Sequence, residues 1–252
     1  MSIQLHFNRS TLSAQEQQWF NSPEAIQALT TKANWVTGGP YNRIWRWQSP
    51  EGSFYYIKIY HARGHHLRQY CAKSRARGEW ENLLYFQKRN LLVPELLVYG
   101  ESSLLHKNYE GGFLVQREVS NCWDLRFLAK EEPRWHADSL WRRQLLRNIA
   151  ASLQRLHADR FVHRDFKWRN ILIKRDDSLA TYLIDCPLGR RHLSFLYNLG
   201  WWRDLRAFDK TARRFLSRTD RLRFYLAYRQ QIKLKQKDKH MITKIYGENG
   251  IS

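Results

Sequence analysis

The chain has 252 residues, of which 43% are hydrophobic and 26% are charged, an ordinary balance for a globular protein. Lys and Arg number 43 against 23 Asp and Glu, so the formal net charge is +20. A surface of this sign attracts polyanions such as nucleic acid, an anionic membrane or a phosphorylated glycolipid. The three cysteines are widely spaced and form no CxxC pair, which argues against a disulfide framework and against a zinc site.

The first ten residues lack the apolar core of a signal peptide, and no stretch approaches the 18 apolar residues of a membrane span. We therefore expect a cytoplasmic protein, whose contact with a membrane would be peripheral.

Strand-like segments dominate the first half of the chain, after a lead-in over residues 1–30 that reads as rich in helix. Between Trp35 and Tyr60, three runs of β-formers are separated by short turns that contain Gly and Pro, a pattern typical of hairpins. A helical rhythm follows within residues 67–89, and two more strands are expected at Leu96–Tyr99 and at 112–116.

Helices dominate after residue 118. Trp141–His157 carries apolar side chains at intervals of three and four, which predicts an amphipathic helix. Two short strands are expected at Asn170–Lys174 and 180–184, and residues 201–232 read as helical and strongly basic. This order predicts an α+β fold with two lobes. Residues 1–118 form a small antiparallel β lobe with a helical lead-in and one main helix, and residues 119–252 form a larger, mostly α lobe.

Residues 161–173 carry the clearest chemical signal. They read Phe-Val-His-Arg-Asp-Phe-Lys-Trp-Arg-Asn-Ile-Leu-Ile, between an amphipathic helix and a short strand, and match the catalytic-loop pattern H-R-D-x-x-x-x-N of protein kinases. Phosphoryl transfer needs a carboxylate that orients the acceptor hydroxyl and accepts its proton, a role that Asp165 fits. Lys167 can stabilise the charge that gathers on the γ-phosphate oxygens. His163 is expected to pack within the loop as a structural support.

A site of this kind also needs Mg²⁺, which prefers oxygen ligands. Asn170 offers a neutral amide oxygen five residues after Asp165, and Asp185 stands at the end of the second expected strand. That place belongs to the Asp of the D-F-G motif, although Cys186 and Pro187 replace its Phe and Gly. The sequence therefore predicts ATP and Mg²⁺ as cofactors, with Asn170 and Asp185 as metal ligands.

The β lobe is predicted to bind the nucleotide. Lys58 lies in a strand-like run of aromatic and branched residues, where a lysine is unfavourable unless it has a partner. Glu79, on the expected helix, is our first choice for that partner, and Glu81 is the alternative. Such a lysine would hold the α- and β-phosphates of ATP.

Two further segments of this lobe are candidates for nucleotide contact. Gly38 and Gly39 join two strands ahead of Lys58, as a loop that covers the phosphates would, but they fit an ordinary hairpin turn equally well. Glu118 and Val119 stand where the β lobe ends, in the position of a hinge whose backbone would bind adenine.

With these residues the chain resembles the Kdo/WaaP family of lipopolysaccharide kinases, which are relatives of the protein-kinase superfamily. The resemblance extends from Trp35 to Tyr228. Its particular marks are RGEW around Glu79, LLVP ending at Pro94, RDL at 203–205 and RLRFYLAY at 221–228. It implies a helix that starts near Asp204, whose carboxylate braces the catalytic loop.

The resemblance also implies a two-lobed protein-kinase-like fold and an activity. The family uses ATP and Mg²⁺ to phosphorylate heptose or Kdo in the inner core of lipopolysaccharide, at the cytoplasmic face of the inner membrane. The expected partners are therefore this glycolipid and the anionic membrane surface, and no nucleic acid.

The segment between Asp185 and Asp204 has only 18 residues and no A-P-E sequence, so it lacks the platform on which protein kinases hold a peptide. A small sugar acceptor fits such a site better. Basic residues follow the metal site, where the acceptor is expected to dock: Arg190, Arg191, Arg203, Arg206, Arg213 and Arg214.

Other functions remain open at this level. The short segment after Asp185 argues against a protein kinase. The sequence His-Arg-Asp at 163–165 argues against an aminoglycoside-type kinase, because that class resembles His-Gly-Asp at this point. A catalytically silent scaffold is disfavoured by the complete set of phosphotransfer residues, although Cys186-Pro187 leaves it open. Nucleic-acid binding has only the C-terminal run of Lys233, Lys235, Lys237 and Lys239 behind it, and such a run is usually a solvated tail.

Overall fold

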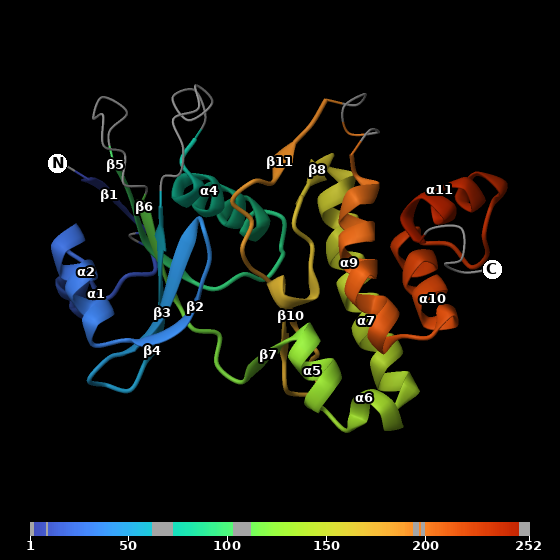
Figure 1. Ribbon diagram of the computed structural model, residues 1–252, viewed down its shortest axis with the longest axis horizontal. Helices are drawn as coiled ribbons and strands as arrows, with labels where there is room; N and C mark the ends of the chain where they lie inside the picture. The colour runs from blue at the N-terminus through green and yellow to red at the C-terminus, as the bar shows by residue number, and fades with distance from the viewer. Residues whose placement is uncertain are drawn as a thin grey trace. The chain divides into compact units, whose positions relative to one another are not determined.

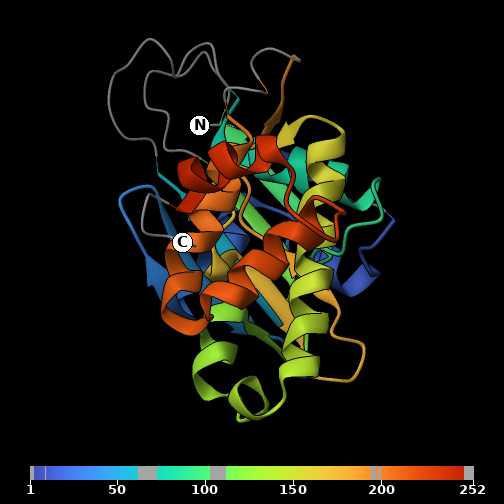
Figure 2. The same cartoon turned by 90° about the vertical axis from the view of Figure 1, so that its right-hand side faces the viewer.

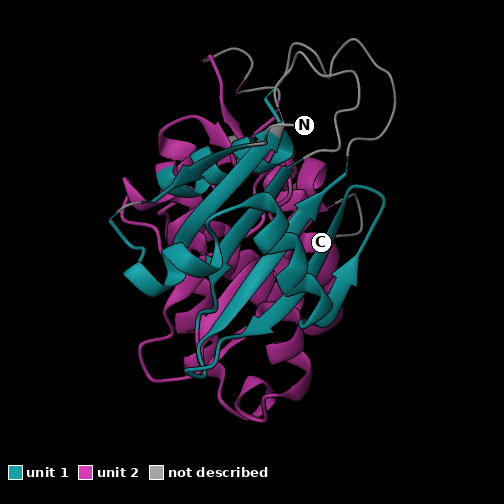
Figure 3. Ribbon diagram, turned by 90° about the vertical axis from the view of Figure 1, so that its left-hand side faces the viewer, with its two compact units in different colours: residues 1–84, 94–119 teal, residues 85–93, 120–252 magenta. Residues whose placement is uncertain are grey.

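The structure, a computed structural model, describes residues 3–8, 10–61, 73–102, 112–193, 197 and 200–246 (Figure 1). The chain divides into two compact units (Figure 3). The first comprises Met1–Leu84 with Pro94–Val119, and the second comprises Tyr85–Val93 with Ser120–Ser252. The limits expected from the sequence, 1–118 and 119–252, differ from these units chiefly in the segment Tyr85–Val93.

A six-stranded antiparallel sheet forms the frame of the first unit. Its strands lie in the order β1 (Ile3–Phe7), β5 (Leu96–Ser102), β6 (Gly112–Arg117), β4 (Phe54–Tyr60), β3 (Asn42–Gln48) and β2 (Asn34–Gly38). The strand β4 is therefore internal to the sheet, with β3 on one side and β6 on the other. Alternation along β4 gives each of its residues a defined face, which is what positions Lys58.

Helices cover the two faces of this sheet (Figure 1). The helices α1 (Ala14–Trp19) and α2 (Pro23–Thr31) pack on one face, where Phe20 and Ile26 join Tyr55 and Ile57 in a buried apolar cluster. The helix α4 (Arg75–Gln87) lies on the other side and faces Lys58.

The lead-in contains two helices, as expected, but it begins with β1, a strand that the sequence pattern did not reveal. This short segment pairs with β5, from Ile3 opposite Ser102 to Phe7 opposite Val98. Its partner lies about a third of the chain away, so no local turn signal marks the pairing.

The second unit is mostly helical (Figure 2). Its helices are α5 (Leu125–Glu131), α6 (Arg134–Ala137), α7 (Ser139–Ala158), α9 (Trp202–Phe215), α10 (Arg218–Tyr228) and α11 (Gln236–Tyr246). The apolar stripe of α7 is fully buried, and α7 and α9 both pack against α10. Within the part of the chain that the structure describes, no helix has the length and apolar character that a membrane crossing requires.

The basic region 201–232 consists of two helices, because Ser217 ends the first run and caps α10 through the backbone N–H of Asp220. In the C-terminal run of lysines, Lys237 and Lys239 belong to α11, whereas Lys233 and Lys235 precede this helix. Ile245 and Tyr246 are buried there, and Tyr225 donates a hydrogen bond to the Asp238 carboxylate at 3.0 Å.

Two small sheets support the loop that carries the catalytic motif. One joins β7 (Cys122–Asp124), β9 (Ile171–Lys174) and β10 (Thr181–Leu183), and the other pairs β8 (Phe161–Val162) with β11 (Arg190–Arg191). The residues between β8 and β9, which include the short 3-10 helix Trp168–Asn170, are thus anchored at both ends.

Candidate functional site

In the first unit, Lys58 and Glu79 form a buried ion pair. The Lys58 Nζ lies 3.0 Å from one carboxylate oxygen of Glu79 and 2.9 Å from the other. Lys58 is 7% exposed and Glu79 is fully buried, so each charge depends on the other for stabilisation. The Tyr60 hydroxyl donates to the same carboxylate. The structure therefore brings together the two residues expected to hold the nucleotide phosphates.

The strand and the helix explain this pairing. Lys58 and Tyr60 are two residues apart on β4 and so point to the same face, toward α4. The alternative partner, Glu81, instead bonds to the exposed side chains of Lys73 and Arg77. Tyr60 had no assigned role in the sequence-based prediction, and its place in the same β alternation as Lys58 is the signal that points to it.

Gly38 and Gly39 form the turn between β2 and β3. Gly38 pairs with Arg43, and the Gly39 N–H donates to the Asn42 carbonyl at 2.8 Å. A Cβ at Gly38 would come within 2.5 Å of the Trp35 ring, whereas a Cβ at Gly39 would meet nothing within 4 Å. Packing therefore accounts for the first glycine and leaves room beside the second. Contact of either glycine with a nucleotide stays a prediction.

Glu118 and Val119 end the first unit. The Glu118 N–H donates to the Phe54 carbonyl at 2.9 Å, and the Glu118 carboxylate accepts two hydrogen bonds from Arg46 at 2.5 and 3.1 Å. This N–H is used within the protein, so a hinge at this point would offer adenine the Glu118 carbonyl and the Val119 backbone.

In the second unit, the catalytic motif folds into a compact loop. The Lys167 Nζ lies 2.5 Å from one carboxylate oxygen of Asp165. The side-chain amide of Asn170 donates to the other oxygen at 3.0 Å and to the Asp165 carbonyl at 2.9 Å. The Asp165 carboxylate is therefore held from two sides, by Lys167 and by Asn170.

Asp185 is tied to the same loop through its neighbours. The Ile184 N–H donates to the Asn170 carbonyl at 3.0 Å, and the buried Cys186 Sγ contacts the His163 carbonyl at 3.6 Å. Asp185 itself has a φ of 59°, a left-handed backbone that is costly for a non-glycine residue and typical of functional sites. These contacts bring Asp185 beside Asn170.

The donor set at this point fits a hard cation. Because the Asn170 amide nitrogen is turned to Asp165, its oxygen is the remaining side-chain atom that could ligate a metal. Asp185 adds a carboxylate, and Mg²⁺ is commonly held by one or two carboxylates together with substrate phosphates. Among the described residues, no group of three or more His, Cys, Asp or Glu side chains is suited to a metal, so the proposed ligands are one amide and one carboxylate.

Asp204 connects α9 to the catalytic loop. Its fully buried carboxylate accepts hydrogen bonds from the backbone N–H groups of His163 and Arg164, both at 2.7 Å. The His157 Nε2 lies 3.1 Å from the same carboxylate, and the His157 Nδ1 lies 2.8 Å from the Tyr228 hydroxyl. Neither His157 nor Tyr228 was identified from the sequence, where His157 reads only as a histidine at the end of an apolar helix stripe.

His163 is packed between aromatic rings. It is 1% exposed, stacks on Phe86 at 5.8 Å between ring centroids, and meets Phe166 edge-on at 5.6 Å. Neither ring nitrogen has a hydrogen-bond partner among the described residues. Burial lowers the pKa of His163 although three carboxylates, on Asp165, Asp185 and Asp204, act in the opposite direction. The neutral ring therefore packs against Phe86 and Phe166 inside the loop, which suits a structural role better than the role of a base.

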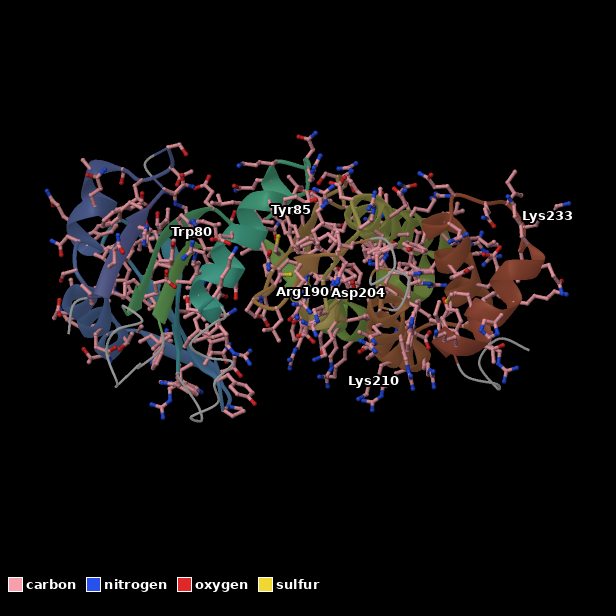
Figure 4. The ribbon with its side chains drawn as sticks, turned by 90° about the horizontal axis from the view of Figure 1, so that it is seen from above. Trp80, Tyr85, Arg190, Asp204, Lys210 and Lys233 are labelled. Atoms are coloured by element: carbon pink, nitrogen blue, oxygen red, sulfur yellow. The ribbon has the colours of Figure 1, made fainter. Side chains whose placement is uncertain are left out.

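The outer face of α9 is entirely basic. Every exposed side chain on this helix is cationic, namely Arg203, Arg206, Lys210, Arg213 and Arg214, although Arg213 also pairs with Asp209 at 2.8 Å. The two acidic residues of α9, Asp204 and Asp209, are buried. Figure 4 shows Lys210 pointing outward while Asp204 lies in the interior. We call these five exposed residues the α9 basic face.

The chain matches a known protein family and resembles solved structures. The model of the family described as "Lipopolysaccharide kinase (Kdo/WaaP) family" matches residues 27–246. Among solved structures, "WaaP in complex with acyl carrier protein" superposes with a TM-score of 0.69 at 19% identity, covering 96% of this chain and 92% of that chain. The pseudokinase domain of BIR2, an immune regulator of the RLK/Pelle family, has a TM-score of 0.48 at 20% identity, covering 73% and 53% of the two chains. Among curated proteins, none matches the sequence significantly.

The structural likeness to WaaP shows that the fold is protein-kinase-like, with a β-rich first unit and a mostly helical second unit. The family model spans far more than half of the sequence, which identifies the chain as a phosphotransferase. The protein belongs to the lipopolysaccharide kinase (Kdo/WaaP) family.

Proposed function

We propose that this protein transfers the γ-phosphoryl group of ATP to a sugar hydroxyl, of heptose or Kdo, in the inner core of lipopolysaccharide. Family membership supports the reaction class. The observation that carries the proposal is the arrangement of the second unit, in which Asn170 bonds to Asp165 and is joined through its carbonyl to the residue before Asp185.

Asp165 is proposed to act on the acceptor. Its carboxylate is partly exposed, with 30% of the side chain accessible, so a sugar hydroxyl can approach it. The carboxylate would orient this hydroxyl and accept its proton as the new P–O bond forms. Lys167, also partly exposed beside it, would stabilise the charge that develops on the transferring phosphoryl oxygens.

Asn170 and Asp185 are proposed to hold Mg²⁺ through oxygen atoms. Bound there, the cation would neutralise charge on the β- and γ-phosphate oxygens of the nucleotide. The hydrogen bond from Asn170 to Asp165 gives the metal site and the acceptor site one shared, rigid element.

In the first unit, Lys58 is proposed to bind the α- and β-phosphates. Glu79 and Tyr60 fix its position, since the carboxylate accepts hydrogen bonds from both side chains. We further propose that Gly38 and Gly39 approach the phosphates and that the Glu118 carbonyl and the Val119 backbone bind adenine.

The α9 basic face is proposed to attract the anionic glycolipid and the membrane surface that carries it. The buried side of the same helix is joined to the catalytic loop by Asp204, which accepts hydrogen bonds from the backbone N–H groups of His163 and Arg164. Trp202 at the start of the helix has Lys244 Nζ 4.7 Å from its ring centroid, and a tryptophan among cations suits a wet, lipid-facing boundary.

Mass spectrometry of core oligosaccharide tests the proposal. Cells that lack the gene are complemented with the wild-type chain, with Asp165→Asn, or with Asp177→Asn as a control. Asp177 is a fully exposed acid in the same unit, so this control removes the same charge away from the loop. We expect one phosphate at a defined sugar position with the wild type and the control, and none with Asp165→Asn. A phosphate retained in the Asp165→Asn cells would remove this carboxylate from its proposed role, and an unchanged core in all strains would refute the activity.

A further inference from the structure

One face of the six-stranded sheet carries Lys58, and the alternation of residues shows which other side chains share this face. Ile57 and Val115 belong to the buried apolar cluster that packs against α1 and α2, so their side chains point to the opposite face. Tyr56 therefore points the same way as Lys58. Residues directly opposite each other on paired strands share a face, and Gln116 of β6 lies opposite Tyr56. The Gln116 side chain is thus on the Lys58 face.

Gln116 lies between the two ends of the proposed nucleotide site. On β6, Leu114 is opposite Lys58, which is proposed to bind the phosphates, and Gln116 follows two residues later. Two residues of a strand span about 7 Å. Glu118, whose carbonyl is proposed to bind adenine, comes after two more residues. A nucleotide that reaches from Lys58 to Glu118 therefore passes over Gln116 and Tyr56, with its base at the Gln116 end.

The Gln116 side chain has unused capacity for hydrogen bonds. Its Oε1 is buried and accepts no hydrogen bond from the described residues, although the residue as a whole is partly exposed. A buried polar atom without a partner is costly, and native proteins commonly satisfy such atoms with water or a ligand. This amide is therefore available to a ligand that lies against the sheet.

The charged side chains next to Gln116 bind each other. Arg46 lies opposite Tyr56 on β3, and its guanidinium donates to the Glu118 carboxylate at 2.5 and 3.1 Å. The same guanidinium lies 3.5 Å from the centroid of the Phe54 ring. The two charges of this pair balance, so this end of the face presents a ligand with an amide and the half-buried ring of Tyr56. An amide beside an aromatic ring suits an uncharged purine base, because bases stack on aromatic side chains.

We propose that Gln116 selects the base of the nucleotide. Its Oε1 accepts a hydrogen bond from the 6-amino group of adenine, its Nε2 donates one to N7, and the Tyr56 ring packs against the base. This inference rests on the proposed function and adds the residue that distinguishes ATP from GTP. A glutamine amide matches adenine at these two positions, whereas guanine has acceptors at both of them. Either orientation of the amide would then leave Oε1 facing an acceptor of guanine.

Binding of ATP and of GTP to the full chain, measured by calorimetry with Mg²⁺, tests the proposal without an acceptor. The proteins are the wild type, Gln116→Leu and the control Gln27→Leu. Gln27 is exposed on α2, which packs on the opposite face of the sheet, so the control loses the same amide away from the site. We expect the wild type and the control to bind ATP about tenfold or more tightly than GTP, the effect of one hydrogen bond and one avoided mismatch.

Gln116→Leu should lose most of this preference, because ATP binding weakens while GTP binding changes little. An unchanged preference would refute the role of Gln116. Equal weakening of both nucleotides would also refute it, since the amide would then not distinguish the bases.

The analogue 7-deaza-ATP, which has a C–H in place of N7, separates a contact with the base from packing by Gln116. The wild type should bind this analogue severalfold more weakly than ATP, because the hydrogen bond from Nε2 is lost. Gln116→Leu should bind both nucleotides alike. The same ratio of affinities in the two proteins would overturn the proposed contact.

Phosphorylation of core oligosaccharide is measured independently of these titrations. Base selectivity that depends on Gln116, in a protein that adds no phosphate to the core, would support the inference and remove only the acceptor from the proposed function. Phosphorylation of the core by a Gln116→Leu variant with the selectivity of the wild type would leave the kinase activity intact and overturn the inference.

Discussion

The side-chain amide of Asn170 donates to the Asp165 carboxylate at 3.0 Å and to the Asp165 carbonyl at 2.9 Å. The residue proposed to hold the metal therefore also fixes the residue proposed to orient the acceptor. The amide must present its nitrogen to Asp165, and this leaves the oxygen for the cation. The side chain of Asn170 therefore fixes the position of Asp165 relative to the proposed metal site.

Replacing Asn170 by Ala should consequently affect both. We expect the Mg²⁺ concentration for half-maximal activity to rise at least severalfold, because one oxygen ligand is lost. We also expect kcat to fall by about tenfold or more at saturating Mg²⁺, because Asp165 loses a hydrogen bond that orients it. Initial rates over a range of Mg²⁺ concentrations measure both. A mutant with unchanged Mg²⁺ dependence would show that Asn170 is not a ligand.

Because Lys58 and Glu79 form a buried ion pair, we expect a single substitution to lower the free energy of unfolding more than the double substitution does. Lys58→Met leaves the Glu79 carboxylate buried without its ammonium partner, so we expect the free energy of unfolding to fall by about 3–5 kcal/mol. The double substitution Lys58→Met with Glu79→Leu should be less destabilised, because no buried charge remains. Urea unfolding of the three proteins gives the comparison. Equal stability of the single and double variants would contradict the mutual dependence of the two charges.

A comparison with Asp209, another buried acid of α9, tests whether Asp204 has a specific role in bracing the catalytic loop. In Asp204→Asn an amide N–H would face one of the two backbone N–H groups that the carboxylate now accepts, so we expect a loss of about 1–3 kcal/mol in stability and a fall in kcat. Asp209→Asn is the matched control, since Asp209 is also buried on α9 but pairs with Arg221 at 2.6 Å. The control should lose stability yet keep the kcat of its folded fraction. A loss of kcat that simply follows stability in both variants would argue against the bracing role.

His163 predicts a specific pH dependence of stability. Its pKa in the folded protein lies below the usual value of 6.5 because the ring is buried. The unfolded chain therefore binds a proton at this imidazole at pH values where the folded chain does not. Stability from this residue is fully present above pH 6.5 and is lost as the pH falls below it, by at most about 1.4 kcal/mol per pH unit. Replacing His163 by Phe removes the titrating group, so the slope of unfolding free energy against pH should decrease between pH 5 and 6.5. An unchanged slope would refute the assignment.

The α9 basic face predicts a salt-dependent attraction to the acceptor. Exposed charges are screened over about 10 Å at 0.1 M salt, so affinity for anionic core fragments should fall as salt is raised. The double variant Arg206→Gln with Lys210→Gln should bind more weakly at low salt and show a shallower salt dependence. Arg126→Gln with Lys130→Gln, an exposed pair with the same spacing on α5, is the control. Fluorescence titrations at 50 and 200 mM salt compare the three proteins. Identical salt dependence in all of them would assign the attraction to another surface.

Short-range patterns of apolar and polar residues predicted most of the helices and strands. The run from Phe54 to Tyr60 matches β4 at both ends, because alternating β-formers between turns are a short-range signal. The stripe expected over Trp141–His157 falls within α7 for the same kind of reason. The strand β1 was missed, and the packing of α11 was not foreseen, because the lysine run that enters this helix was expected to be solvated. Each is stabilised by residues distant in sequence: β1 by β5, and α11 by Tyr225 and by packing on α9.

The candidate site shows the same division. The prediction of Asp165, Lys167 and Asn170 as site residues follows from a motif of eight residues, since these residues are close neighbours in the chain. Tyr60, His157 and Tyr228 were not identified, because each acts through a partner that only folding brings near.

The amino-acid sequence by itself predicted the family, the order of strands before helices, and a set of residues whose types and spacing suit phosphoryl transfer. Tertiary structure alone decided that Glu79 rather than Glu81 neutralises Lys58, that Asp204 holds the catalytic loop through two backbone N–H groups, and that the cations of α9 share one face while its acids are buried. The physical reason is the distance in sequence between the partners. Residue spacing indicates which side chains are neighbours within one turn or strand. The partner of a buried charge lies far away in the chain, so only the folded structure shows which group it is.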